Sequence, residues 1–181
     1  RTTLGLRGDG YRYKVDAIRS LNDGEGTSGL VSPKATAVFG PWGGSEIYLN
    51  YGRGYHSNDP RAATTRVDPV TGDLTDTASP LVPARGGEIG FRSVAVPRVQ
   101  STIALWYLSF DSELVFVGDA GIAEASRPSR RYGVEWTNYL NLTDGLTGEL
   151  DMSFSDTRFS DLDPAGFYIP GALDRVIAGA L

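Results

Sequence analysis

Residues 45–59 alternate apolar and polar side chains one by one, and this pattern restricts the fold more than any other feature. Ile47, Leu49 and Tyr51 share one side of an extended chain, and the residues between them share the other. A period of two is typical of a β-strand with one buried and one polar face, and the two glycines that follow Tyr51 would weaken a helix. The segment therefore predicts a long β-strand.

The same period recurs along the chain, so we expect an all-β fold, an antiparallel up-and-down meander of about eight long strands. The predicted strands are residues 4–18, 34–39, 45–55, 88–96, 101–116, 131–137, 149–155 and 172–181. The apolar phase of the first strand changes across Gly8-Asp9-Gly10. A tight hairpin or a glycine β-bulge would explain the change, and we favour the bulge.

Antiparallel pairing of residues 131–137 with residues 149–155 predicts one shared apolar face, because a slip of one residue would invert it. The side chains on that face are Tyr132, Val134, Trp136, Leu150, Met152 and Phe154. Residues 101–116 are apolar on both faces for part of their length, so the pattern leaves open which side of that strand faces the interior.

Short and long connections alternate between the predicted strands. The short ones are residues 41–44, 97–100 and 141–145, and the long ones are residues 19–30, 57–86, 118–129 and 160–171. Alternate connections of a meander lie at opposite ends, so all the long loops gather at one end. This arrangement is typical of a partial transmembrane β-barrel, an open curved sheet, with Trp42 and Tyr139 in an aromatic girdle. A soluble β-sandwich also alternates, but its strands are usually shorter and its long loops have no common end.

Composition excludes several function classes. The absence of cysteine excludes disulfides and thiolate metal sites, and a formal net charge of -5 gives no reason to expect a nucleic-acid partner. His56 is the only histidine, and no nucleophile motif accompanies it, so we expect no catalytic residue, no metal site, no cofactor and no enzymatic activity.

Three segments carry a family resemblance: residues 51–59 (YGRGYHSND), residues 112–119 (SELVFVGD) and residues 127–135 (RPSRRYGVE). They resemble the barrel of TonB-dependent outer-membrane receptors, and the similarity extends over nearly the whole chain. The resemblance implies a barrel of about 22 strands, filled by an N-terminal plug, that imports a scarce ligand such as a ferric siderophore across the bacterial outer membrane of Gram-negative cells. The resemblance also implies that TonB delivers the energy for this import.

From this resemblance we expect residues 1–181 to be an internal piece of the later barrel, without the plug, the TonB box or the terminal aromatic residue. The implied partners are outer-membrane lipid, a small-molecule ligand, and TonB through parts absent from this chain. An alternative is an autonomous small outer-membrane barrel or a soluble β-rich binding module.

The loop at residues 57–86 is longer than a strand connection requires, and such loops are often functional. We expect it to form part of the extracellular vestibule, with arginines that favour an anionic ligand such as a ferric chelate. The predicted ligand contacts are Tyr55, His56, Asn58, Asp59, Arg61 and Arg66. A loop that only shields the surface is the alternative.

Overall fold

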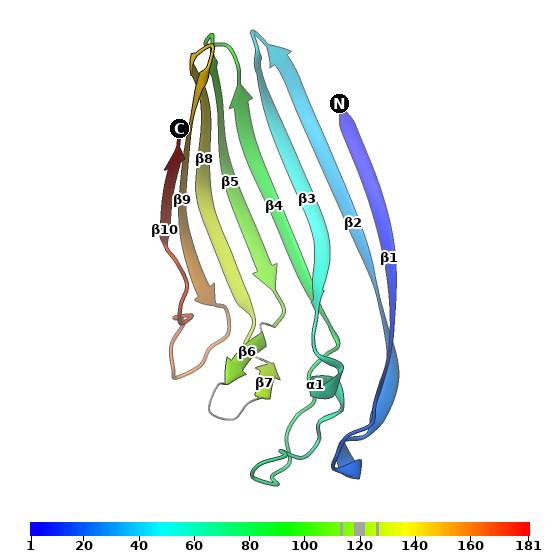
Figure 1. The fold of residues 1–181 in the computed structure, drawn as a ribbon. Coiled ribbons are helices and arrows are strands. Elements are labelled where there is room, and N and C mark those ends of the chain that lie inside the picture. The colour runs from blue at the N-terminus through cyan, green and yellow to red at the C-terminus, as the bar shows by residue number, and fades with distance from the viewer. Residues whose placement is uncertain (113, 118–121, 126) are drawn as a thin grey trace.

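The computed structural model describes residues 1–112, 114–117, 122–125 and 127–181. Its main element is one antiparallel sheet whose strands pair in chain order, as Figure 1 shows. The strands are β1 (Thr2–Val15), β2 (Gly24–Trp42), β3 (Ser45–Ser57), β4 (Leu81–Ser93), β5 (Val99–Phe110), β8 (Ser129–Thr143), β9 (Leu146–Phe159) and β10 (Arg175–Ala180). β1 and β10 form the two edges, so the sheet is open. The predicted all-β meander is confirmed.

Small elements lie in the connections. A 3-10 turn, η1 (Ser20–Asn22), follows β1, and a short helix, α1 (Pro60–Thr64), follows β3. The strands β6 (Leu114–Val117) and β7 (Ile122–Ala125), which come between β5 and β8 in the chain, pair with each other as a separate two-stranded antiparallel sheet. The strand predicted for residues 101–116 therefore ends early, at Phe110; residue 113 and residues 118–121 and 126 of this region lie outside the described residues. No described helix is both long and apolar enough to cross a membrane.

The predicted alternation of connections is confirmed. The short connections, residues 43–44, 94–98 and 144–145, lie at the upper end in Figure 1. The longer connections, which follow β1 (residues 16–23), β3 (residues 58–80), β5 and β9 (residues 160–174), begin where these strands end, at the lower end. Gly43 and Gly44 both have positive φ, +57° and +80°, which is the backbone that a two-residue hairpin turn requires. We call the lower end the long-loop end.

Two strands begin earlier than their sequence predicts. Turn composition predicts a loop for residues 24–30, but they pair with β1, and β4 begins at Leu81 instead of residue 88. Gly26 illustrates the reason, since a Cβ there would lie 2.6 Å from the Tyr13 hydroxyl oxygen. Gly26 of β2 therefore leaves room for the ring of Tyr13 on the neighbouring strand β1, and the composition of residues 24–30 alone cannot predict this contact.

The predicted bulge at residues 8–10 is wrong, and so is the alternative hairpin. β1 pairs with β2 in one unbroken register, with Asp9 opposite Leu30. The apolar phase changes because one face of the same strand carries Leu4 near one end and Arg12 near the other, while Tyr13 lies on the opposite face. A strand that runs from an apolar into a polar environment has this pattern without any irregularity.

The register divides the sheet into two faces, because residues directly opposite each other in an antiparallel pair share a face. The apolar face carries Leu4, Leu6, Ala35, Ala37, Phe39, Ile47, Leu49, Tyr51, Ile89, Phe91, Ile103, Leu105, Tyr107, Tyr132, Val134, Trp136, Leu150, Met152, Phe154 and Ile177. The polar face carries Asp9, Lys34, Glu46, Asn50, Glu88, Arg92, Glu135, Asp151 and Ser153. The predicted shared face of β8 and β9 is confirmed.

The predicted girdle positions have different outcomes. Trp42 lies opposite Ser45, on the apolar face beside a short turn, as expected. Tyr139 lies opposite Glu149, on the polar face, so its assignment to an apolar girdle is wrong. The register also places Trp106, Leu108 and Phe110 on the polar face, which resolves the ambiguity of β5.

Charged and amide groups pair across the strands on the polar face. Glu46 forms an ion pair with Arg92, and Asn50 Nδ2 donates to Glu88 Oε1 at 2.7 Å. Buried apolar side chains are few among the described residues, and most lie at the long-loop end: Ala78, Leu81, Val82, Phe159 and Ile169. The compact part of the structure is therefore the end where the loops pack.

Candidate functional site

Three side chains from three strands meet on the polar face at the long-loop end. The His56 ring of β3 lies 6.3 Å from the Phe110 ring of β5, with 44° between the planes. The guanidinium carbon of Arg131, on β8, lies 5.2 Å from the centre of the same Phe110 ring, in range of a cation–π interaction. His56 Nε2 is buried and finds no hydrogen-bond partner among the described residues. We call these three residues the mouth cluster.

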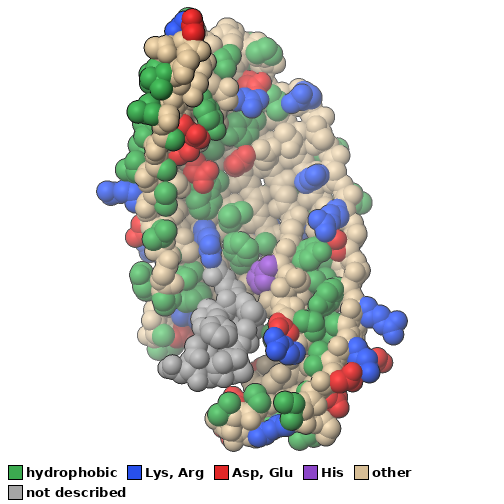
Figure 2. Space-filling view, in the orientation of Figure 1, with side chains coloured by type: hydrophobic (Ala, Val, Ile, Leu, Met, Phe, Trp, Pro, Cys, Tyr) green, Lys and Arg blue, Asp and Glu red, His purple; other side chains and the backbone are tan. Residues whose placement is uncertain are grey.

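A hollow of about 630 Å³ lies nearby, and Figure 2 shows the hollowed face with the single histidine in purple. Glu88, Trp106 and Glu135 contribute to its lining from the polar face. Trp106 lies opposite both Glu88 and Gly133, and its indole Nε1 is buried without a partner in the described part of the chain. The hollow thus combines carboxylates with a buried aromatic donor that has no partner among the described residues.

The loop after β3 is docked on the loop after β1. Asn22 is buried; its Nδ2 donates to the Val67 carbonyl at 2.8 Å, and its Oδ1 accepts from the amides of Arg66 and Val67 at 2.9 and 3.0 Å. Thr64 is also buried, and a Cβ at Gly24 would lie 2.8 Å from its methyl carbon. The two loops therefore form one packed unit at the long-loop end.

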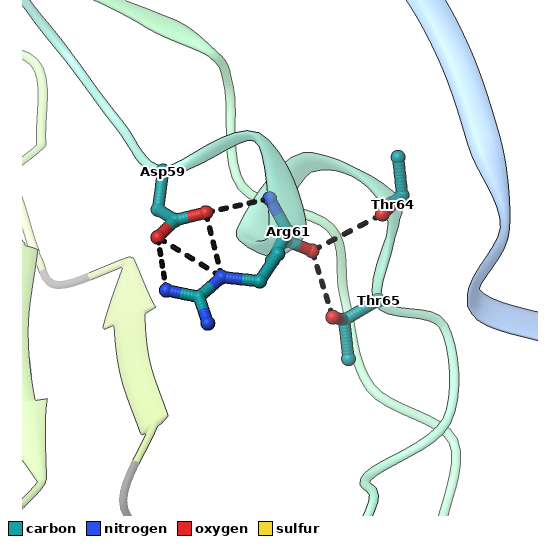
Figure 3. A network of polar contacts seen from close by, with 4 residues as sticks. All are labelled: Asp59, Arg61, Thr64 and Thr65. Atoms are coloured by element: carbon teal, nitrogen blue, oxygen red, sulfur yellow. Dashed lines mark hydrogen bonds and ion pairs between the residues drawn. The ribbon is translucent and has the colours of Figure 1, made fainter. Parts of the chain in front are cut away.

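Helix α1 begins with a local polar network, drawn in Figure 3. Asp59 Oδ1 accepts from the Arg61 amide at 2.9 Å, and the Arg61 guanidinium donates to both Asp59 carboxylate oxygens. The hydroxyls of Thr64 and Thr65 donate to the Arg61 carbonyl at 3.3 and 2.7 Å. These hydrogen bonds from Arg61 lower the pKa of Asp59, so the pair stays charged and shapes the turn.

A second loop is anchored by Arg127, just before β8. Its Nε donates to both carboxylate oxygens of Asp161 at 2.8 Å, and its Nη1 donates to the Gly166 carbonyl at 2.8 Å. The Arg127 guanidinium also lies 4.5 Å from the centre of the Phe159 ring. Hydrogen bonding to Arg127 lowers the pKa of Asp161. The loop after β9 is thereby held to the start of β8.

The six predicted ligand contacts do not converge on one point. His56 belongs to the mouth cluster, and the Tyr55 ring lies 5.9 Å from the guanidinium carbon of Arg7 on β1. Asn58 is buried, and its Nδ2 donates to the Ser79 carbonyl at 2.7 Å, which closes the base of the loop.

The other three lie in the loop after β3. Asp59 and Arg61 pair with each other, with a 2.5 Å contact between Oδ2 and Nη2. Arg66 is exposed, and Asn22 holds its backbone amide. Three of the six, Asn58, Asp59 and Arg61, therefore make local contacts that build the loop.

The sequence pattern does not single out Phe110, Arg131 or Asn22. For Phe110 the sequence contains part of the information: the alternation groups it with the other even-numbered residues of β5 on one face, but it does not show which face of the sheet that is. Arg131 is opposite Leu108 on the polar face, but a single charged residue in a strand gives no such indication. Asn22 lies in a segment whose composition is that of an ordinary turn. Among the described residues, no group of three or more histidine, aspartate or glutamate side chains could hold a metal ion.

Solved structures of an iron transporter and of siderophore and ferric-catecholate receptors share this fold. The FrpB iron transporter of Neisseria meningitidis (F3-3 variant) matches with a TM-score of 0.63 and 17% identity, over 93% of this chain and 25% of the transporter. The siderophore receptor PiuA of Acinetobacter baumannii matches with a TM-score of 0.61 and 15% identity, over 92% and 25%. The ferric-catecholate import receptor Fiu of E. coli K12 matches with a TM-score of 0.53 and 18% identity, over 77% and 20%.

The chain spans about a quarter of the length of the first of these structures, and at such low identity the likeness shows the fold alone. No curated protein matches the chain by sequence. The sequence model of the family "TonB dependent receptor-like, beta-barrel" matches residues 1–176, nearly the whole chain. This family of receptors and transporters is characteristic of the Gram-negative outer membrane. The chain therefore belongs to the TonB-dependent receptor-like β-barrel family.

Proposed function

We propose that this chain forms part of the barrel wall of an outer-membrane receptor that imports a scarce ligand such as a ferric siderophore. In this proposal the receptor lies in the bacterial outer membrane, and a plug and a TonB-contacting segment outside this chain complete it. Family membership, the gathering of long loops at one end and the two unlike faces support the proposal. The structural neighbours named for iron or siderophores suggest the ligand class.

The mouth cluster is the observation that carries the ligand proposal. Phe110 and His56 offer flat aromatic surfaces, and Arg131 adds a positive charge beside them. Many ferric chelates are anionic and contain planar rings, so they suit stacking and charge-assisted hydrogen bonds together. In this proposal the strand residues bind the ligand.

The loop at residues 58–80 then has a supporting role. Asn58 and the Asp59–Arg61 pair shape it, while Tyr55 at the strand end and Arg66 on the loop surface meet the ligand as it arrives. Docking of the loop on Asn22 holds it at the long-loop end. The loop therefore guides the ligand toward the polar face.

Uptake of radioactive iron by cells that produce the full receptor tests the proposal, with catecholate, hydroxamate and citrate chelates as probes. We expect Phe110→Ala and Arg131→Gln to weaken binding of the favoured chelate by about tenfold each, since each removes a stacking or charged contact. Arg98→Gln is the control, because Arg98 pairs with Asp144 at the end of the sheet that carries the short turns. Wild-type uptake of every chelate by correctly inserted Phe110→Ala and Arg131→Gln variants would contradict the proposal.

Loop replacement tests the supporting role separately. Residues 60–78 are exchanged for a short Gly-Ser linker, which leaves Asn58 and all of β4 intact. We expect normal insertion but weaker uptake of the favoured chelate. Unchanged uptake in the inserted variant would leave the loop with a shielding role only.

A further inference from the structure

Four arginines lie in one row across the apolar face at the long-loop end. Arg53 is directly opposite Arg85, and Arg85 is opposite Ser109 on the next strand. Ser109 is in turn opposite Arg130, which is opposite Arg158. All four arginines are exposed. We call this set the arginine row; it crosses β3, β4, β5, β8 and β9.

The positive charge of the arginine row is only partly balanced. Arg158 pairs with Asp156 on the same face at 2.6 Å. Within the described part of the chain, Arg53, Arg85 and Arg130 form no ion pair with a carboxylate. Like charges placed directly opposite each other destabilise a sheet, so an arginine opposite an arginine favours an external anion. The anion must approach from the side of the apolar face.

The neighbouring row, toward the short turns, is aromatic. Tyr51 lies opposite Gly87, Gly87 opposite Tyr107, and Tyr107 opposite Tyr132. Because Gly87 has no side chain, a depression of about 440 Å³ opens in this row. Tyr51 and Tyr107 flank it, and Ile89 and Leu105 also contribute to its lining. Aromatic rings of this kind mark the level where a barrel meets the membrane interface.

The order of the rows matches the layers of a membrane leaflet. Along the strands of the apolar face, aliphatic side chains come first, the tyrosines follow, and the arginines come last. In a membrane leaflet the order from the centre outward is acyl chains, then glycerol or sugar, then phosphate. Adjacent strands are about 4.8 Å apart, so the backbones of Arg85 and Arg130 are separated by roughly 10 Å, which a double-phosphate head group can bridge. Guanidinium groups bind phosphate oxygens with paired hydrogen bonds.

We propose that the arginine row binds the phosphate groups of a membrane lipid on the outside of the barrel, with an acyl chain in the Gly87 depression. Arg53, Arg85 and Arg130 supply the phosphate contacts, while Asp156 engages Arg158. The site lies on the opposite face of the sheet from the mouth cluster and does not depend on which ligand the receptor imports. It assigns a lipid partner to residues 53, 85 and 130.

Binding of lipid A to the purified full receptor in detergent tests the proposal by native mass spectrometry. The probes are lipid A with two phosphates and the same lipid without phosphate. We expect the phosphorylated lipid to bind at least about tenfold more tightly to the wild-type protein, because charge-assisted hydrogen bonds depend on the phosphate. Equal binding of the two lipids would overturn the proposal and requires no variant.

Variants locate the site. The double variant Arg53→Gln/Arg85→Gln should lose about tenfold in affinity for phosphorylated lipid A, and Arg85→Lys should lose less, because it keeps the charge but not the paired hydrogen bonds. Arg98→Gln is the control, since Arg98 pairs with Asp144 at the short-turn end. Heat-dependent gel migration confirms that each barrel is folded. Full affinity in the folded double variant would overturn the assignment.

Inorganic phosphate distinguishes a lipid from a free anion. At millimolar concentration it should leave phosphorylated lipid A bound, because it lacks the acyl chains that occupy the depression. Displacement of the lipid by inorganic phosphate would show a site for free phosphate and would overturn the lipid assignment.

Discussion

Asn22 and Val67 form two hydrogen bonds with each other, at 2.8 and 3.0 Å, although 45 residues separate them in the chain. The side-chain amide of Asn22 donates to the Val67 carbonyl and accepts from the Val67 amide, as the backbone of a neighbouring β-strand would. The loop after β3 is therefore tied to the loop after β1 by one amide group. This contact gives the first prediction.

Asn22→Ala should release the loop at residues 58–80 while the sheet stays folded. Loss of the buried amide leaves backbone groups of Arg66 and Val67 without partners, which costs about 1 to 3 kcal/mol locally. Hydrogen exchange should become faster in this loop and remain unchanged in β4. Asn22→Asp, which keeps the acceptor and loses the donor, should increase the exchange rate less. Unchanged exchange in both variants would show that the Asn22 side chain does not hold the loop.

Gly133→Ala should destabilise the barrel by about 1 to 3 kcal/mol, because overpacking forces neighbouring groups to move. A Cβ at Gly133 would collide with the backbone carbonyl of Phe154 and lie 2.9 Å from the Trp106 ring. Gly54→Ala is the matched control, since a Cβ at Gly54 meets nothing within 4 Å. Urea unfolding of the receptor in lipid vesicles measures both. Equal stability of the two variants would show that Trp106 does not pack over Gly133.

Met152→Arg and Ser153→Arg compare the two faces at neighbouring positions of one strand. Met152 lies opposite Trp136 and Ile177 on the apolar face, and Ser153 lies opposite Glu135 on the polar face. Near the bilayer midplane the Met152 variant should lose about 2 to 4 kcal/mol, whereas the Ser153 variant should be tolerated. Refolding into vesicles at increasing urea distinguishes them. A larger loss of unfolding free energy for Ser153→Arg would show that the two faces are assigned the wrong way round.

Acid should loosen helix α1 through the Asp59–Arg61 pair. Because the pKa of Asp59 is lowered in the folded chain, its contribution to stability is present above the pKa of the unfolded carboxyl. That contribution is lost as the pH falls through the lowered pKa, below about pH 4. Hydrogen exchange of residues 61–65, corrected for the intrinsic pH effect, measures the change. Asp59→Asn should remove this pH dependence while the Asn side chain still caps the helix.

The isolated chain of residues 1–181 should aggregate in water. β1 and β10 are unpaired edges of the described sheet, and large apolar side chains such as Leu4, Leu6 and Ile177 are exposed. Open edges and a broad apolar face both favour association between copies. Analytical ultracentrifugation with and without detergent measures this. A soluble monomer with a cooperative melt in the absence of detergent would contradict the membrane assignment of the apolar face.

The sequence by itself determined the class of fold, the two faces and the gathering of long loops at one end. Each of these depends on local information, because the period of two places alternate residues of a strand on opposite faces without knowledge of the partner strand, as in residues 45–51 and 149–155. The shared face of Val134 and Phe154 was predictable for this reason. The segments at residues 51–59, 112–119 and 127–135 also indicated the family, because that resemblance depends on the identity of consecutive residues alone.

Only the tertiary structure decided the strand limits and the composition of the sites. Residues 24–30 look like a loop by composition, yet they pair with β1 because that strand supplies their hydrogen-bond partners. The mouth cluster joins residues from β3, β5 and β8, and the arginine row joins residues from four strands. Such groupings depend on register, and register is set by pairing between distant segments, so no local pattern contains it.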